Sequence, residues 1–372
     1  MGGLAGLMRS MHEITEKNKC RSARELYIDI IRVLAAFLVI FTHTGDIGSK
    51  LYAFNDYGTL RNGIYIMADV IRCINVPLFF MVSGALLLRK KESYKELLYK
   101  RIFKYVIILV VMSYFYFVIF YGNRWSDFGL FFEQLCTRYV TGLYWFLYEY
   151  IGYLLILPFL RKIVATMEKK DYQYLLIMGV FFKGMLNVAT GILGWGNILI
   201  PFRMSVDAIF YPLMGDYIAN LPCDVHKESG RIKKNIIFGL IASCICVLAA
   251  TYMVHWEAYK LGGYNESRET YLASFSVIPT IYVFYAIRVW CVNLQMPPIV
   301  SKVFHFIGEN SFGIYLFSIF AQVKMLFVHE KISALLPGFP LISCLIYIMI
   351  VLIVEAVAVS LLRKIPCMKR II

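Results

Sequence analysis

The sequence predicts an all-α fold, a polytopic bundle of about ten transmembrane helices. Of the 372 residues, 60% are hydrophobic, the mean hydropathy is +0.66, and apolar runs long enough to cross a bilayer recur along the whole chain. A water-soluble globular protein is therefore excluded. The segments between the runs are short and include no Pro/Ser-rich linker. One membrane domain is therefore expected to carry the function.

Windows of about 20 apolar residues fit ten times in the sequence. They lie near residues 25–45, 65–88, 102–121, 142–160, 172–190, 204–220, 235–255, 271–293, 307–328 and 341–362. We accordingly divide the chain into an N-terminal cytoplasmic segment (1–24), a single transmembrane domain (25–365) and a cytoplasmic tail (366–372).

Lysine and arginine set the predicted orientation, because they favour cytoplasmic loops. With a cytoplasmic N-terminus, 25 of the 38 basic residues fall in cytoplasmic segments and eight in external ones. Both termini are therefore predicted to be cytoplasmic. The net charge of +14 has the same origin, since basic residues beside apolar spans face anionic head groups. We expect the lipid bilayer as a partner, and no nucleic acid.

The nine cysteines show no metal-ligand spacing, and none makes a convincing external pair. They are interpreted as small apolar residues. No metal site and no bound cofactor are expected.

The first span contains the run IRVLAAFLVIFTH, in which Arg32 stands near the start and His43 at the end. The step between them is close to three helical turns, so both side chains share one face, roughly 16 Å apart along the axis. Asp29, three residues before Arg32, is placed to compensate the guanidinium. Such charges are costly in a bilayer and indicate a functional site, so we expect Arg32 and His43 to face one water-accessible tunnel. The simpler alternative is that Arg32 snorkels to the inner head groups and His43 lies at an interfacial helix end.

The second span carries another ionisable pair, Asp69 and Arg72, and continues as NVPLFFMVSGALLL. A spacing of three residues allows the two side chains to pair on one helix face, toward the interior of the outer half. Pro77 and Gly84 interrupt or loosen the helix where backbone groups are able to line a cavity.

Four motifs follow one another from residue 27 to about residue 320. They are YIDIIRVLAAFLVIFTH, VPLFFMVSGALLL, LYWFLYEYIGYLLILPFLR and GENSFGIYLFS. Together they resemble the acyltransferase 3 family, integral-membrane enzymes that modify surface polysaccharides and related molecules. The first motif looks like the family's first helix, with its arginine, ten-residue gap and histidine. The second is similar to the family's Pro-Leu-Phe-Phe and Ser-Gly signature, and the other two resemble its fourth-span and late Ser-Phe-Gly-Ile-Tyr motifs.

This resemblance implies transfer of an acyl group, acetyl above all, from cytoplasmic acyl-CoA to a hydroxyl of an extracytoplasmic glycan or glycolipid precursor. Acetyl-CoA would then be a substrate, and the cell membrane, most commonly a bacterial inner membrane, the location. The resemblance also implies that His43 is catalytic and that Arg32 is its partner near the donor.

Three departures from the family pattern bear on this interpretation. Larger relatives carry a fused extracytoplasmic hydrolase-like domain that this sequence lacks, so the membrane domain is expected to pass the acyl group straight to its acceptor. The late motif has Ser318 where a histidine is common, and therefore predicts no second catalytic histidine. Glu149 follows Trp145 by four residues, whereas one branch of the family has a glutamate five residues on.

Acyl transfer to a hydroxyl needs a base, a stabiliser for the tetrahedral oxyanion and exclusion of water. His43 suits the first task, because an imidazole titrates near neutrality and is able to pass the proton to the leaving thiolate. The alternative is nucleophilic catalysis through an acyl-imidazole. The sequence leaves both routes open.

Donor-binding candidates lie after the second span. Lys100, Arg101 and Lys104 belong to the densest basic cluster and are the candidates for the phosphates of coenzyme A. The alternative is that they only mark a cytoplasmic loop. Ser83, in the Ser-Gly motif, is a further donor-side candidate, although close helix packing is the more common reason for a small residue there.

Acceptor-side candidates are the ionisable and aromatic residues of the outer half. They are Asp69, Arg72, Trp145, Glu149, Arg203 and Asp207. Trp145 would stack on a sugar ring, unless it belongs to an interfacial aromatic belt. Arg203 and Asp207 repeat the spaced pair of the second span, with a rim salt bridge as the alternative. Four charged residues within spans have no assigned role: Lys183, Arg288, Lys324 and Glu355.

A transporter or flippase is the main alternative function, because a polar interior would also serve a small solute or a lipid-linked sugar. Alternating access usually leaves an inverted repeat or matched broken helices in the sequence, and neither is evident. The enzyme is therefore the favoured interpretation.

Overall fold

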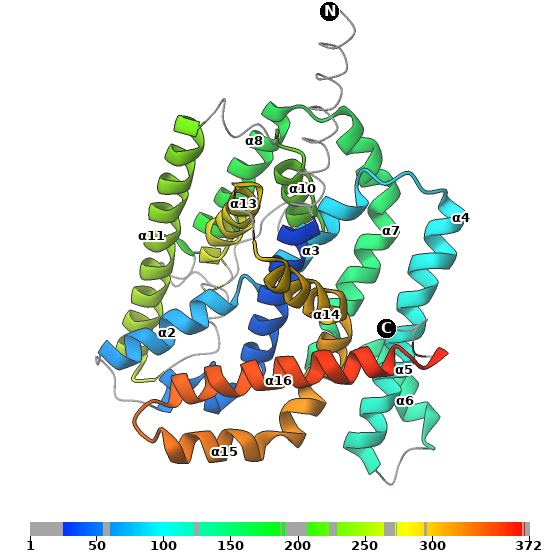
Figure 1. Ribbon diagram of the computed structural model, residues 1–372, viewed down its shortest axis with the longest axis vertical. Helices are drawn as coiled ribbons and strands as arrows, with labels where there is room; N and C mark the ends of the chain where they lie inside the picture. The colour runs from blue at the N-terminus through cyan, green and yellow to red at the C-terminus, as the bar shows by residue number, and fades with distance from the viewer. Residues whose placement is uncertain are drawn as a thin grey trace, which may run out of the picture.

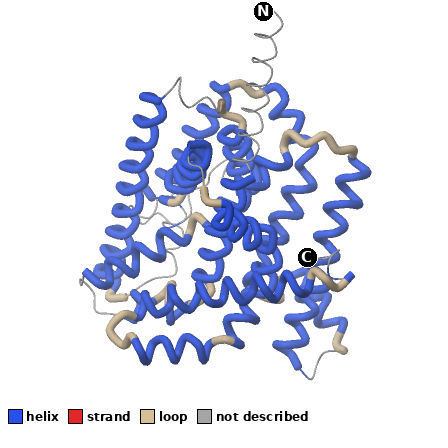
Figure 2. Tube along the Cα trace, viewed as in Figure 1, coloured by secondary structure: helices blue, strands red, loops and turns tan. Residues whose placement is uncertain are grey.

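The computed structural model describes residues 25–54, 60–122, 126–186, 188, 189, 207–222, 229–263, 272, 274–293, 296–366 and 368 (Figure 1). Within these ranges all regular structure is helical (Figure 2). The all-α prediction is confirmed for this part of the chain.

The chain opens with a helix over residues 25–42. The longer elements that follow are α2 (Leu60–Arg72), α3 (Asn75–Leu87), α5 (Phe103–Tyr121), α6 (Phe128–Thr137), α7 (Trp145–Thr166), α8 (Lys169–Gly179), α10 (Asp207–Ala219), α11 (Ser229–Leu261), α13 (Val277–Asn293), α14 (Pro298–Lys324), α15 (Leu326–Leu335) and α16 (Pro340–Leu362). The shorter ones are η1 (Gly45–Ile47), η2 (Leu51–Phe54), α4 (Tyr94–Leu97), η3 (Leu98–Ile102), η5 (Gly142–Tyr144) and η6 (Val180–Met185), of which η3 and η6 are π-helical.

Six helical stretches of the described chain are long and apolar enough to cross a bilayer. They are Leu60–Leu87, Tyr94–Phe120, Gly142–Thr166, Gly230–Lys260, Pro298–Lys324 and Pro340–Leu362. The molecule is therefore a multi-pass membrane protein, with fewer full-length spans among its described residues than the ten expected. Two of the other expected spans contain short helices, α10 with 13 residues and α13 with 17. Apolar composition alone does not reveal where a helix begins and ends.

Helix α11 illustrates the surface of such a protein. It lies along one edge of the molecule (Figure 1), and only 11% of its most apolar window is buried. Phe238 is 75% exposed and Ile245 60% exposed. Contiguous exposed apolar surface of this extent is unstable in water and suits hydrocarbon, so we assign this face to lipid.

Helix starts follow local sequence signals. Helices α14 and α16 each carry proline in the first turn. Backbone N–H groups in the first turn make no hydrogen bond within the helix, so proline, which lacks this group, costs nothing there. Asp127 caps α6 by accepting a hydrogen bond from the Leu130 N–H at 3.0 Å. Ser93 and Glu96 form a capping box that starts α4 immediately after the basic loop.

The closest helix contact lies between α3 and α10. A Cβ added at Gly84 would lie 1.9 Å from the Pro212 carbonyl oxygen, and one at Gly215 would lie 2.0 Å from the Met81 carbonyl oxygen. Only glycine therefore allows the two backbones to approach as they do. Ser83, beside this contact, donates its hydroxyl to the Phe79 carbonyl oxygen within its own helix, so it serves local packing.

Three of the segments predicted to be cytoplasmic lie together at one end of the bundle (Figure 1). The segment between α3 and α4, the connection from α7 to α8 and the start of α11 all lie there. The first helix ends toward the opposite side, near η1. The described helices thus have two chemically different ends, one of them rich in lysine and arginine.

Replacing Gly84 or Gly215 by alanine tests the α3–α10 contact. The new methyl group meets a backbone carbonyl that cannot rotate away, so we expect a loss of about 3 kcal/mol or more in stability and a lower melting temperature of the detergent-solubilised protein. Gly152→Ala on α7 is the matched control, because a Cβ there meets nothing within 4 Å. Equal melting temperatures for all three variants would contradict the tight crossing.

Candidate functional site

The end of the bundle opposite the basic loops, which is the end predicted to face outward, contains a cavity of about 320 Å³, called the outer cavity below. Its lining residues come from the first helix, the α2–α3 junction, the start of α7, η6, α10 and the start of the α13 region. They are Val39, Thr42, His43, Arg72, Cys73, Asn75, Val76, Pro77, Leu143, Trp145, Phe146, Lys183, Asp207, Tyr211 and Ser276. The volume lies at the lower end of the usual range for ligand sites, and the lining mixes aromatic with polar side chains as such sites do.

His43 enters this cavity from the end of the first helix. The helix stops at Thr42, whose hydroxyl donates to the Leu38 carbonyl oxygen at 2.8 Å. The same hydroxyl accepts a hydrogen bond of 2.8 Å from the Asn75 amide at the start of α3. Ser49 donates to the Thr42 carbonyl oxygen at 3.1 Å. These bonds fix the helix end against the α2–α3 junction and hold the neighbouring imidazole at the cavity wall.

Arg72, the last residue of α2, lines the same cavity and is paired with Asp69. Their spacing of three residues predicted this pair. The side chain of Asp69 is 1% exposed and that of Arg72 10% exposed, so both charges are removed from water. A buried charge is tolerated only with such a partner.

A second ion pair in the cavity joins Lys183 of η6 to Asp207 of α10. The Lys183 amine also lies 5.4 Å from the centre of the Tyr211 ring. Asp207 was expected to pair with Arg203, which lies outside the described residues; its partner here is Lys183. Sequence reasoning gave Lys183 no role, and its only signal was a charge inside an apolar run.

Trp145, at the first turn of α7, lines the cavity beside Phe146, in keeping with its expected place on the acceptor side. Glu149, one turn further along α7, is exposed and lines neither this cavity nor the inner one described next. The one-residue shift in its motif thus coincides with a side chain directed away from the cavity.

The basic end of the bundle contains a larger cavity of about 810 Å³. Its residues come from the loop between α3 and α4, from α4, and from the last turns of α7. They are Leu88, Arg89, Lys90, Lys91, Glu92, Ser93, Tyr94, Glu96, Leu97, Pro158, Arg161, Val164 and Ala165. Four cations and two carboxylates face this space, which makes it a candidate for an anionic ligand.

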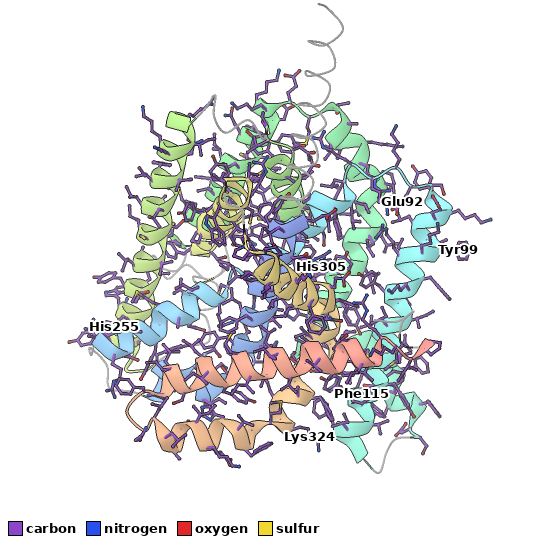
Figure 3. All side chains as sticks on the ribbon, viewed as in Figure 1. Glu92, Tyr99, Phe115, His255, His305 and Lys324 are labelled. Carbon is purple, nitrogen blue, oxygen red and sulfur yellow. The ribbon has the colours of Figure 1, made fainter. Side chains whose placement is uncertain are left out.

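Glu92 holds the inner cavity together. Its carboxylate accepts hydrogen bonds from Arg101 at 2.7 Å and from Arg161 at 2.9 Å, and the Lys90 amine lies 3.1 Å away. The bonds from Arg101, and then those from Arg161 and Lys90, hold the pKa of Glu92 well below its usual range against the opposing effect of burial. Figure 3 labels Glu92 at this end of the molecule.

A second carboxylate, behind the cavity lining, binds Arg89 of the basic loop. Asp216 of α10, with a side chain 0% exposed, accepts hydrogen bonds from Arg89 at 2.9 Å and from the Tyr172 hydroxyl at 3.0 Å. The basic loop is thereby tied to α8 and α10 as well as to α7.

The predicted phosphate ligands lie beside the inner cavity and do not line it. Lys100 is exposed and pairs with Glu96 at 2.9 Å, whereas Arg101 reaches the cavity only through Glu92. Lys104 is on α5, further from the loop. The capping box at Ser93 starts a new helix that leads away from the basic loop, so these three residues lie outside the lining, and their expected role as phosphate ligands stays a prediction.

Arg32 lines neither cavity. It lies 3.5 Å from Asp29, as its spacing predicted, and the other oxygen of Asp29 lies 2.8 Å from Nδ1 of His305 on α14; Figure 3 labels His305. On the face between Arg32 and His43, Ala35 and Val39 are buried among apolar neighbours. Neither of the two cavities is lined by both Arg32 and His43, so these cavities do not form the single tunnel expected to connect the two residues.

Aromatic side chains fill the space between the two cavities. Along α7, Phe146 lines the outer cavity and Pro158 the inner one, a separation of roughly 18 Å along the axis. Tyr150 and Tyr153, between them, are buried. The ring of Phe80 on α3 packs on Phe146 and on both tyrosines, with centroids 5.3 to 6.5 Å apart. We call Phe80, Phe146, Tyr150 and Tyr153 the aromatic wall.

Residues 25–359 match a protein-family profile described as an acyltransferase domain, the domain of the acyltransferase 3 family. The resemblance seen in the motifs is confirmed over nearly the whole chain. No curated protein and no solved structure matches it.

Glu92→Gln removes the carboxylate that three cations share, and we expect it to lower the melting temperature at pH 7. The folded-state pKa lies below the usual 4.5, so the stabilisation is fully present above about pH 4.5 and is lost as the pH falls toward the folded-state value. The difference in melting temperature from the wild type should therefore shrink between about pH 5 and about pH 3.

Glu133→Gln, in an exposed pair with Arg138 on α6, is the matched control. Surface pairs contribute little, so this variant should melt like the wild type at every pH. A Glu92→Gln difference that stayed constant across the range would contradict the assignment.

Proposed function

The chain belongs to the acyltransferase 3 family, and we propose that it moves an acyl group, acetyl in the first instance, from cytoplasmic acyl-CoA to a hydroxyl of an extracytoplasmic glycan or glycolipid. One observation carries this proposal: His43 lies in a polar, aromatic-lined cavity at one end of the bundle, and a cation-lined cavity occupies the other. A membrane acyltransferase needs these two environments, one for each substrate. Such an O-acetylation would modify surface polysaccharide from the cell membrane.

The inner cavity is the proposed donor site. Acyl-CoA carries several phosphates, and Arg89, Lys90, Lys91 and Arg161 supply cations around a volume large enough for a nucleotide-sized group. Arg101 contributes indirectly, because it shares Glu92 with Arg161. The pantetheine arm would extend from here toward the outer end.

His43 is the proposed catalytic residue at the outer end. As a general base, it would take the proton of the acceptor hydroxyl while the hydroxyl oxygen bonds to the acyl carbon; the carbon–sulfur bond then breaks and the thiolate receives the proton. In the alternative route an imidazole nitrogen first bonds to the acyl carbon and the carbon–sulfur bond breaks to release the thiolate; the hydroxyl oxygen then bonds to the acyl carbon, the carbon–nitrogen bond breaks, and the freed imidazole takes the hydroxyl proton. The Arg72 guanidinium, in the same cavity, is the proposed stabiliser of the oxyanion in both routes.

Arg32 is the proposed partner on the donor side. It lies in the inner half of the first helix, with Asp29 and His305 as its polar surroundings. The aromatic wall stands between the proposed donor cavity and His43, so the proposal requires donor binding to part those rings. A thioester that crosses the wall would meet the acceptor away from cytoplasmic water.

His43→Ala tests the central role. Purified protein is given acetyl-CoA and a glycan extract, and thiol release and acetylated product are measured. We expect a loss of at least about 10²-fold, the usual contribution of a positioned general base, with unchanged membrane abundance and melting temperature. Arg32→Ala should instead raise the KM for acetyl-CoA.

His255→Ala is the control, because His255 lies on α11 and lines neither cavity. Full activity in His43→Ala would remove the catalytic assignment. Solute uptake by vesicles of wild-type protein that neither binds nor consumes acetyl-CoA would favour the transporter.

A further inference from the structure

Lys183 is a charged residue of the outer cavity to which the proposed reaction gives no task. It lies in the π-helical turn η6, which continues α8. A π turn holds more residues than an α turn and is less favourable, and such turns are frequent at functional sites. The side chain is 10% exposed, so most of it is shielded from solvent where it lines the cavity.

The packing of this segment leaves little freedom. A Cβ at Gly179, the last residue of α8, would lie 2.2 Å from the Phe210 ring, so the end of α8, from which η6 continues, is pressed against α10. Helix α10 is in turn fixed against α3 through Gly215. Lys183 and Asp207 are therefore held opposite each other by two helix contacts, that of α8 with α10 and that of α10 with α3.

The exposure of the two partners differs. The Lys183 side chain is 10% exposed and the Asp207 side chain 30% exposed. Lysine is also covered by the Tyr211 ring, 5.4 Å from its amine. The carboxylate is thus the more accessible member of the pair, and it has accepting capacity beyond its contact with the amine.

The charges of the outer cavity compensate each other. Arg72 is paired with Asp69 and Lys183 with Asp207. A ligand with its own negative charge would face the Asp207 carboxylate and compete with it for Lys183. A neutral ligand rich in hydroxyl groups would donate to Asp207 and stack on Trp145, and both cations would keep their partners.

We propose that Lys183 and Asp207 orient the acceptor: the Asp207 carboxylate receives hydrogen bonds from an uncharged polyhydroxy ring, and Lys183 holds that carboxylate in place so that another hydroxyl of the ring faces His43. The inference rests on the proposed acyl transfer and assigns to it an acceptor class, a neutral sugar. Asp207 is the binding group, and Lys183 is a positioning residue.

Acceptor kinetics test the pair. Methyl β-glucoside serves as the probe, with purified protein in nanodiscs and saturating acetyl-CoA. Asp207→Asn and Lys183→Met should each raise the KM for the glucoside at least tenfold, with less than a threefold change in kcat and an unchanged Kd for coenzyme A. Lys183→Arg keeps a cation and should recover most of the loss. Glu133→Gln removes one partner of the exposed Glu133–Arg138 pair, neither residue of which lines a cavity, and this variant should behave like the wild type.

The charge of the acceptor gives a second, independent readout. Methyl β-glucuronide has the same ring with a carboxylate, and the wild type should use it with a kcat/KM at least tenfold lower than the glucoside. Asp207→Asn should reduce that preference to less than threefold, because the repelling charge is gone.

Three results would overturn the inference: an unchanged acceptor KM in both variants, a wild-type preference for the glucuronide, or no transfer to either probe while acetyl-CoA is still consumed in a His43-dependent manner. In all three the proposed acyl transfer survives. Loss of coenzyme A binding and of acetyl-CoA consumption in the wild type is the separate result that removes both.

Discussion

The close approach of α3 and α10 is the contact on which both cavities depend. Each helix presents a glycine to a carbonyl oxygen of the other, Gly84 to Pro212 and Gly215 to Met81. The first residues of the two helices, Asn75 and Asp207, line the same outer cavity. At the opposite end Arg89, just beyond α3, binds Asp216 near the end of α10. The helices therefore run parallel, and a shift at their crossing would displace both walls at once.

Charge compensation is the second constraint. In a bilayer an unpaired ion is costly, and the inner cations meet their partners at Glu92 and Asp216, whereas the outer ones meet Asp69 and Asp207. The two ends nevertheless differ in how the charges are paired. Each cation of the outer cavity has a carboxylate of its own, Asp69 for Arg72 and Asp207 for Lys183. At the inner end one carboxylate, Glu92, is shared by Lys90, Arg101 and Arg161, so cations are in excess there.

Sequence reasoning succeeded where the relevant geometry is local. A spacing of three residues on one helix predicted the Asp29–Arg32 and Asp69–Arg72 pairs, and both are present. The helical class followed from the apolar runs, and the motifs identified the family. The expected outer position of Trp145 agrees with its place in the cavity.

Features that depend on distant packing could not be predicted in the same way. Lys183 lies in a π turn and contacts Asp207, which is 24 positions further along the chain. No periodicity in the sequence indicates either the turn or the contact. The density of basic residues indicated Lys100 and Lys104 as phosphate ligands, a role that stays a prediction, but density alone did not indicate that the loop before them and Arg161 of α7 would line the cavity. That Arg32 and His43 line no common cavity likewise depends on the packing of distant segments around the first helix.

The aromatic wall explains how two such cavities coexist in one membrane domain. A permanently open path between them would admit water to the thioester and join the two sides of the bilayer. Rings are suited to close it, because they fill volume and keep favourable contacts in more than one offset arrangement. Tyr105 extends the wall sideways, with its ring 4.8 Å from Tyr150 and 5.3 Å from Phe312. In the proposed reaction the donor arm would have to replace these contacts with its own, so that the path opens only when it is filled and water stays excluded.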